Sequence, residues 1–171
     1  MLRPKIEQAL NDQINHEFAA SFSYLAITAY MDSESLGGFA TWFKMQHAEE
    51  QVHAHRLFNY VNDRGGTVKL KSIPEPVQEY ESPQAAFEQG LEMERENTRL
   101  INELYALAIE ERDFATQSHL SWFLDEQVEE EKLFEDALAL LKRFGNDPGG
   151  LLMLNEQFGN RSDSPDGGEE A

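Results

Sequence analysis

Four acidic residues interrupt the predicted apolar faces of four helices in this chain. They are Glu17, Glu50, Glu94 and Glu130. Apolar residues recur around each of them at alternating steps of three and four, the spacing of a helix face that is buried in a bundle. A buried carboxylate costs several kcal/mol unless it is protonated, paired or bound to a cation. Four of them on four helices therefore indicate a metal site.

The acids belong to two similar sets. In each set, one acid comes from a first helix, and two polar residues spaced three apart come from one face of the next helix. The first set is Glu17 with Glu50 and His53, and the second is Glu94 with Gln127 and Glu130. The interval from the first acid to the pair is the same in both sets. Carboxylate-bridged dimetal sites in bundles have this layout, and here Gln-x-x-Glu replaces a second Glu-x-x-His.

Charge and ligand type narrow the choice of metal. The four acids carry a total charge of −4, which matches two divalent cations. Carboxylates with one imidazole suit iron better than a purely oxygen-ligated alkaline-earth ion, and no soft ligand is present to favour copper(I). We therefore expect a pair of divalent metal ions.

Other residues near these sets have more than one interpretation. Tyr24 lies two turns beyond Glu17 on the same face, where its phenol either packs in the core or reaches the metals and donates an electron. Trp122 lies off the face of Gln127, which favours packing. Three further acids flank the sets, and their spacing alone favours a solvated edge: Glu49, Glu126 and Glu129. The histidines outside the predicted faces are expected at the surface or an interface: His16, His47, His55 and His119.

Capping and breaking residues set the bounds of the predicted helices. Pro4 is tolerated in a first turn, and Gly145 ends a helix. Ser35, Ser82 and Asp113 are predicted N-caps. The predicted helices cover residues 4–31, 36–64, 83–110, 114–145 and 148–158. The fold class is therefore all-α.

The connection between the second and third helices sets the topology. The first and third connections span a few residues, so the helices they join form antiparallel hairpins. Residues 65–82 contain two prolines and reach about 59 Å when extended. The predicted second helix, residues 36–64, spans about 43 Å. The segment can therefore run the length of the bundle, which predicts a four-helix bundle with a long crossover and a short fifth helix.

Length, charge and cysteine content bound the class of protein. The 171 residues, 40% of them hydrophobic, suffice for one domain with a sizeable core, expected over 1–158 and followed by an acidic, disordered tail over 159–171. The net charge of −18 excludes a general nucleic-acid binder. The absence of cysteine excludes disulfides, thiolate zinc sites and cysteine-ligated iron–sulfur clusters. Neither a signal peptide nor a membrane span is predicted, so we expect a cytoplasmic protein.

With these residues laid out, the chain resembles the ferritins, most closely the bacterial non-haem ferritins. The resemblance covers residues 1–158. The matching motifs are Asn15-His16-Glu17, Tyr24, the segment His47-Ala48-Glu49-Glu50-Gln51-Val52-His53, Glu94 and the segment Asp125-Glu126-Gln127-Val128-Glu129-Glu130-Glu131-Lys132. Together they are highly specific, although no single one would be.

The resemblance implies an iron-storage protein that forms a hollow shell of 24 subunits. Each subunit would oxidise Fe²⁺ with O₂ or H₂O₂ at a diiron ferroxidase centre and pass Fe³⁺ to a mineral core. The implied ligands are Glu17, Glu50 as the bridge, His53 and Glu94, with Gln127 and Glu130 completing the surroundings of the second iron. The implied third iron site is formed by Glu49, Glu126, Glu129 and the shared Glu130. Tyr24 matches the tyrosine beside the family's site.

The chain differs from haem-binding members of the family and from animal ferritins at several positions. Val52 stands where haem-binding members have methionine, so no haem is expected. Animal ferritins line their three-fold channels with acids where this chain has Gln117 and Leu120. Iron entry through an acidic three-fold pore is therefore not expected, and a route through the subunit is favoured.

Two other functions remain open at this stage. The chain could be a diiron oxidase or peroxidase that acts in oxidative-stress defence without bulk storage. It could also be a structural bundle whose buried polar groups only set the helix register. Four acids in one layer argue against the structural bundle.

Overall fold

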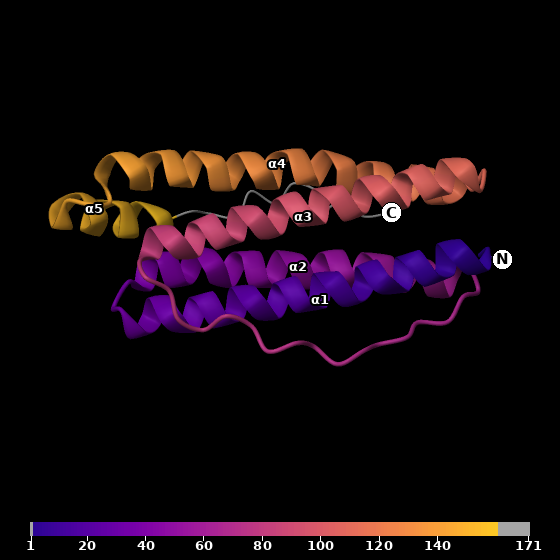
Figure 1. The fold of residues 1–171 in the computed structure, drawn as a ribbon, viewed down its shortest axis with the longest axis horizontal. Helices are drawn as coiled ribbons and strands as arrows, with labels where there is room; N and C mark the ends of the chain where they lie inside the picture. Colours follow the sequence, from indigo (N-terminus) through magenta and orange to yellow (C-terminus); the bar gives the residue numbers. More distant parts are fainter. Residues whose placement is uncertain (1, 161–171) are drawn as a thin grey trace.

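The computed structural model describes residues 2–160, which form five helices and contain no strand (Figure 1). The helices are α1 (Pro4–Ser33), α2 (Gly37–Asp63), α3 (Pro83–Glu110), α4 (Phe114–Phe144) and α5 (Pro148–Gly159). The all-α class and the bundle with a short C-terminal helix are thus confirmed. Part of the acidic tail, residues 161–171, lies outside the described residues.

Two helical hairpins make up the bundle. α1 and α2 run antiparallel, as do α3 and α4, and α5 lies at the end where α4 finishes (Figure 1). The crossover from Arg64 to Ser82 runs along the outside of the bundle from one end to the other, so α2 and α3 point the same way (Figure 1). Within residues 2–160, no helix is both long and apolar enough to cross a membrane.

The core consists of two apolar clusters separated by a polar layer. One cluster is rich in aromatic residues and includes Phe39, Trp42, Phe43, Phe87 and Phe134. The other is mostly aliphatic, with Ile6, Leu10, Leu57, Ile101 and Leu120 among its members. In each of α1 to α4, residues of one cluster precede the predicted acid and residues of the other follow it. The acids therefore lie in one layer across the middle of the bundle.

The ends of the predicted faces are less buried than expected. Phe144 is exposed at 38%, and Tyr60, Thr98 and Tyr105 are half-buried. Tyr60, Tyr105 and Phe144 lie near the ends of their helices, whereas Thr98 lies in the middle of α3. This lower burial does not affect the four acids themselves.

Three helix starts have the expected side-chain caps. Ser82 accepts a hydrogen bond from the Ala85 amide, and Asp113 accepts one from the Thr116 amide. Asp147 does the same for Gly150 at the start of α5. A short polar side chain here satisfies an amide that has no partner within the helix.

The prediction that Ser35 caps α2 was wrong. Ser35 has a φ of 61° and ends α1 instead, which continues to Ser33. The Leu36 amide bonds back to the Met31 carbonyl over 2.9 Å, a geometry that requires a left-handed residue just after the helix. Because Ser35 closes α1 in this way, its side chain does not cap α2.

A residue of α5 caps α2 in place of Ser35. Asn155 Oδ1 accepts hydrogen bonds from the amides of Gly38 and Phe39 over 2.9 and 3.0 Å. A Cβ at Gly38 would lie 1.7 Å from the Asn155 carbonyl oxygen, so only glycine allows this close approach. The short fifth helix is thereby fixed to the start of α2.

Two asparagines of α1 hold the crossover against the bundle. Asn11 donates to the Thr67 carbonyl over 3.0 Å and accepts from the Lys69 amide over 2.6 Å. Asn15, one turn later, makes the same pair of bonds with Lys69 and Lys71 over 2.8 and 2.6 Å. Each side-chain amide thus pairs with the extended backbone as a neighbouring strand would. These contacts give a structural reason for Asn15 within its motif.

Replacing Asn155 with alanine tests the cap. We expect the free energy of unfolding to fall by about 1 kcal/mol, because two amides at the start of α2 lose their acceptor. Urea denaturation measures this. Asn160→Ala is the matched control, since that exposed side chain bonds only to the Glu156 carbonyl of its own helix. Equal losses in both variants would contradict the cap.

Candidate dimetal centre

The first set of predicted residues converges in the structure. Glu17 comes from α1, and Glu50 and His53 come from adjacent turns of α2. Each offers a ligand atom, and these atoms all lie within 4.8 Å of one another. All three side chains are at most 3% exposed. His53 Nδ1 lies 3.4 Å from Glu50 Oε2. Two carboxylates and one imidazole therefore share a small, water-excluded space.

The second set faces the first from α3 and α4. Gln127 Nε2 donates to Glu94 Oε2 over 3.2 Å, which brings these two helices together at the layer. Glu130 accepts a hydrogen bond from Gln46 of α2 over 2.8 Å. The charges of Glu94 and Glu130 both act on Glu50 and raise the pKa of its carboxyl. The acids of the second set are thus close enough to the first set to act on it electrostatically.

Burial dominates the electrostatics of this layer. It raises the pKa of the Glu17 carboxyl well above its ordinary value, and the nearby Glu50 raises it further. Burial is also the largest cause of the raised pKa of Glu50 and of Glu94. The pKa of Glu130 is raised to about 8, first by burial and then by Glu94. Without a cation, burial therefore favours the protonated form of these carboxyls.

Two buried atoms in the layer lack any hydrogen-bond partner. They are Glu50 Oε2 and His53 Nδ1. Buried polar atoms are almost always satisfied, so an unsatisfied oxygen beside an unsatisfied ring nitrogen calls for an explanation. Carboxylate oxygens and imidazole nitrogens are ligands of divalent transition metals. The donor set therefore fits a cation such as Fe²⁺.

Tyr24 contacts the site directly. Its ring is fully buried and stacks on Phe134, with the centroids 5.8 Å apart. Its hydroxyl donates to Glu94 Oε1. Burial and the negative charge of Glu94 raise the pKa of the phenol well above its usual value, so Tyr24 stays protonated. Tyr24 thus packs in the core and also bonds to a predicted ligand, and electron donation by its phenol stays a prediction.

The three flanking acids lie on the edge of the layer. Glu49 is half-buried, and its charge acts on Glu50, Glu94 and Glu130. Burial raises the pKa of the half-buried Glu126, and Glu129 is exposed. Among residues 2–160, only the first set brings three or more acids and histidines together with their ligand atoms within binding range.

Asn97 is a site residue that the sequence analysis missed. It is 2% exposed, whereas Thr98, which the apolar spacing placed inward, is half-buried. Asn97 donates to Glu17 over 3.1 Å. It follows Glu94 by three residues, the spacing that separates His53 from Glu50. This spacing in the sequence could have identified Asn97 as a site residue.

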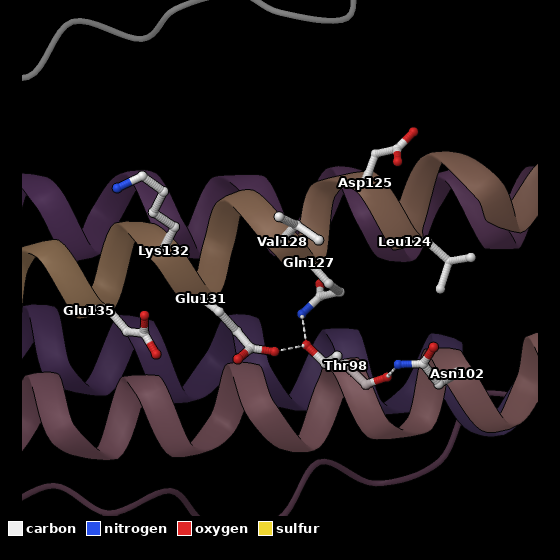
Figure 2. Close-up of a pocket in the computed structure, with 9 residues that line it drawn as sticks. All are labelled: Thr98, Asn102, Leu124, Asp125, Gln127, Val128, Glu131, Lys132 and Glu135. Atoms are coloured by element: carbon white, nitrogen blue, oxygen red, sulfur yellow. Dashed lines mark hydrogen bonds between the residues drawn. The ribbon is translucent and has the colours of Figure 1, made fainter.

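A groove between α3 and α4 reaches the outer side of Gln127 (Figure 2). Its volume is about 600 Å³, and its lining includes Thr98, Asn102 and Glu131. Thr98 donates to Glu131 over 2.6 Å and accepts from Gln127 over 3.3 Å. A buried hydrogen-bond chain thus connects the layer to this groove.

Trp122 and the remaining histidines lie around the site. Trp122 packs edge-on against His53, with centroids 5.4 Å apart, and Arg56 lies over its other face. This agrees with the predicted packing role. His55 is exposed, whereas His119 is half-buried and stacks on Tyr60. Burial lowers the pKa of His119 to about 4.

Comparison with known proteins shows the family of this chain. A family model described as the ferritin-like domain matches residues 7–144. Bacterial non-heme ferritins of Staphylococcus aureus (strain MRSA252) and Staphylococcus haemolyticus (strain JCSC1435) are 41% and 42% identical over 162 residues. In both cases the alignment covers 95% of this chain and 98% of the relative.

Solved structures show the same fold. An open-pore ferritin from the archaeon Archaeoglobus fulgidus superposes with a TM-score of 0.93 at 41% identity, covering 95% of this chain and 100% of that one. A humanized archaeal ferritin gives 0.94 at 41% identity, covering 96% and 100%. The family model spans most of the chain, and the relatives align over nearly their whole length. This chain belongs to the ferritin family.

Proposed function

We propose that this protein stores iron. It binds Fe²⁺ as substrate at two adjacent positions within the helix bundle, oxidises it to Fe³⁺ with O₂ or H₂O₂, and deposits the product inside a hollow shell of 24 subunits. The observation that carries the proposal is the buried set Glu17, Glu50 and His53, with its unpartnered oxygen and nitrogen. Membership in the ferritin family makes iron the expected metal.

The ligands divide into two positions around Glu50. The first position has Glu17 and His53, and the second has Glu94 and Glu130, with Gln127 beside it. Glu50 lies between them and bridges the two ions. Four ionised carboxylates balance two divalent ions, so the buried layer is neutral when both positions are filled with Fe²⁺.

Oxidation disturbs this balance and favours release of the product. Two Fe²⁺ ions lose one electron each to O₂, which takes up two protons and becomes H₂O₂. When two Fe³⁺ ions occupy the layer, its net charge is positive, because four carboxylates no longer cancel the charge of the ions. The edge acids Glu49, Glu126 and Glu129, together with Glu130, offer a third iron position outside the layer toward which an ion can move.

We assign Tyr24 as an electron donor when H₂O₂ is the oxidant: one Fe²⁺ and the phenol would each give one electron, and H₂O₂ would take up two protons from solution and become two waters. Tyr24 is protonated and hydrogen-bonded to Glu94, so its own proton would pass to the Glu94 carboxylate. Gln127, hydrogen-bonded to the same carboxylate, acts with it in the catalytic centre.

Two observations bear on the proposed iron route and on haem. Leu120 is fully buried, and the half-buried Gln117 donates to the Ala108 carbonyl. Neither position carries an acid, so we propose that iron enters through the subunit rather than through an acidic pore at these positions. The Val52 side chain has no donor atom, so no haem is proposed. The proposed protein is cytoplasmic, with Fe²⁺, its oxidant and other copies of the chain as partners, and no nucleic acid or membrane.

Replacing Glu94 with alanine tests the site. We expect the initial rate of aerobic Fe²⁺ oxidation to fall at least about 10-fold, because the second position loses a ligand and Tyr24 loses its acceptor. The absorbance of the ferric product measures the rate, and size-exclusion chromatography shows that assembly is intact. Glu92→Ala, an exposed acid on the same helix, is the matched control and should keep the wild-type rate. Unchanged rates in Glu94→Ala would refute the ligand assignment.

Loading with excess iron distinguishes storage from oxidase chemistry alone. We expect purified protein to elute as a large assembly that carries many more than two irons per subunit after aerobic addition of Fe²⁺. The iron content of the eluted peak measures this. A monomer or dimer that oxidises two irons and then stops would favour the diiron oxidase or peroxidase without bulk storage.

The metal-free protein should lose stability as the pH rises. Its buried carboxyls, Glu17, Glu50, Glu94 and Glu130, have raised pKa values and hold protons that the unfolded chain releases near pH 4.5. The stabilising effect of these protons is full below that pH and is lost as the pH rises through each raised pKa, which for Glu130 is about 8. We expect the Tm to fall between about pH 6.5 and about pH 9, and Zn²⁺ to restore it at the upper end.

The pH range above 6.5 and the Glu130→Gln variant separate the effect of the buried carboxyls from that of His119. His119 has a lowered pKa, so its contribution changes in the opposite direction but only between about 4 and 6.5. Glu130→Gln removes the one group that titrates near 8 and should flatten the slope. A Tm that does not depend on pH in the wild type above 6.5 would contradict the buried charge layer.

A further inference from the structure

Three buried amides join the two halves of the site. Gln13 on α1, Asn97 on α3 and Gln127 on α4 are each at most 4% exposed. Gln13 Nε2 donates to Glu17 Oε1 over 2.8 Å and to Asn97 Oδ1 over 2.6 Å. Asn97 Nδ2 donates to Glu17 Oε2 over 3.1 Å and to Gln127 Oε1 over 3.2 Å. Gln127 Nε2 donates to Glu94 Oε2, so the chain runs from one acid to the other.

The carboxylates at the two ends set the direction of every bond in this chain. A metal-bound carboxylate can only accept, so Gln13 must turn its NH₂ group toward Glu17. The NH₂ group of Gln13 also faces Asn97, so Asn97 must accept with its Oδ1. The NH₂ group of Asn97 is then left to donate to Gln127. Gln127 must therefore present its oxygen to Asn97 and its NH₂ group to Glu94. Reversing any one amide would place two donors or two acceptors in contact.

This direction decides what Gln127 can offer to a metal ion. Its oxygen is the amide atom that can act as a ligand, and Asn97 occupies it. Its NH₂ group is held by the Glu94 carboxylate and the Glu94 carbonyl. It also donates to the Thr98 hydroxyl (Figure 2). The second metal position is then surrounded by carboxylates, whereas the first has the His53 imidazole.

We propose that Asn97 is a positioning residue that orients Glu17 toward the first metal position and withholds the Gln127 oxygen from the second. The difference between the two positions is then set by a hydrogen bond between two amides, and not only by the ligands themselves. This inference rests on the proposed dimetal site and assigns a function to a residue outside its ligands.

Asn97→Leu tests the proposal because leucine keeps the volume and removes both donations. Co²⁺, which is close to Fe²⁺ in ligand preference, is the probe, and its visible absorption reports the coordination of each bound ion. We expect the Kd of the first Co²⁺ to rise about 10- to 100-fold, the usual effect of losing a residue that orients a ligand. We also expect the spectrum of the second Co²⁺ to change, because the freed Gln127 oxygen can turn toward it.

A double variant separates positioning from packing. In Asn97→Leu with Gln127→Leu, the affinity loss should persist, but the spectral change at the second position should disappear because no amide oxygen is left to bind. Asn102→Leu is the matched control on the same helix, since its exposed amide bonds only to the Thr98 carbonyl over 2.8 Å. It should bind Co²⁺ as the wild type does.

Gln13→Leu keeps the test decisive if Asn97→Leu does not fold. It removes the donor that fixes the direction of Asn97, and it should also weaken the first Co²⁺. Unchanged affinity and spectrum in both variants, with two Co²⁺ bound by the wild type, would overturn the role of Asn97 and leave the dimetal site standing. A spectral change that persists in the double variant would overturn it as well. A wild type that binds no Co²⁺ would instead overturn the proposed site.

Discussion

The buried layer of acids is the constraint on which the rest of this bundle depends. Apolar clusters lie on both sides of the layer in all four long helices and exclude water from it. Because water is excluded, the carboxyls hold protons to unusually high pH, and their charge must be neutralised from within. The apolar core thus creates the demand for cations as well as the rigid walls that would hold them.

The position of each acid along its helix lets the layer form in this topology. Glu17, Glu50, Glu94 and Glu130 each lie close to the midpoint of their helix. Midpoints of packed helices meet at one level whichever way the helices point. The crossover decides which helices are neighbours, and Asn11 and Asn15 hold it along the bundle by pairing with its backbone. The residues of α1 that hold the crossover are therefore different from the α1 residue that belongs to the acid layer.

Most of the fold and the two sets of candidate ligands could be predicted from the sequence, because local rules determine them. Apolar spacing locates a helix face, and capping residues such as Ser82 and Asp113 locate its start. The failures involve residues whose partners are distant in sequence. Ser35 is a good N-cap by type, but the turn after α1 uses it, and the cap comes from Asn155 more than a hundred residues later. Asn97 looked exposed because spacing assigns a face only to within about one residue, so Thr98 was placed inward instead.

The two halves of the site have the same spacing but different neighbours, and this difference explains Gln127. In the first half, the acid on α1 receives two amide donors, from Gln13 and Asn97. In the second, the acid on α3 receives a phenol from Tyr24 and a single amide from Gln127. A carboxylate in place of Gln127 could accept from Asn97, but it would repel Glu94 and add a charge to a water-excluded space. A neutral amide can accept from one side and donate to the other, so it joins the halves without adding charge. Of the two positions at which the halves differ, Gln127 is thus the one where the layer needs a connector rather than another acid.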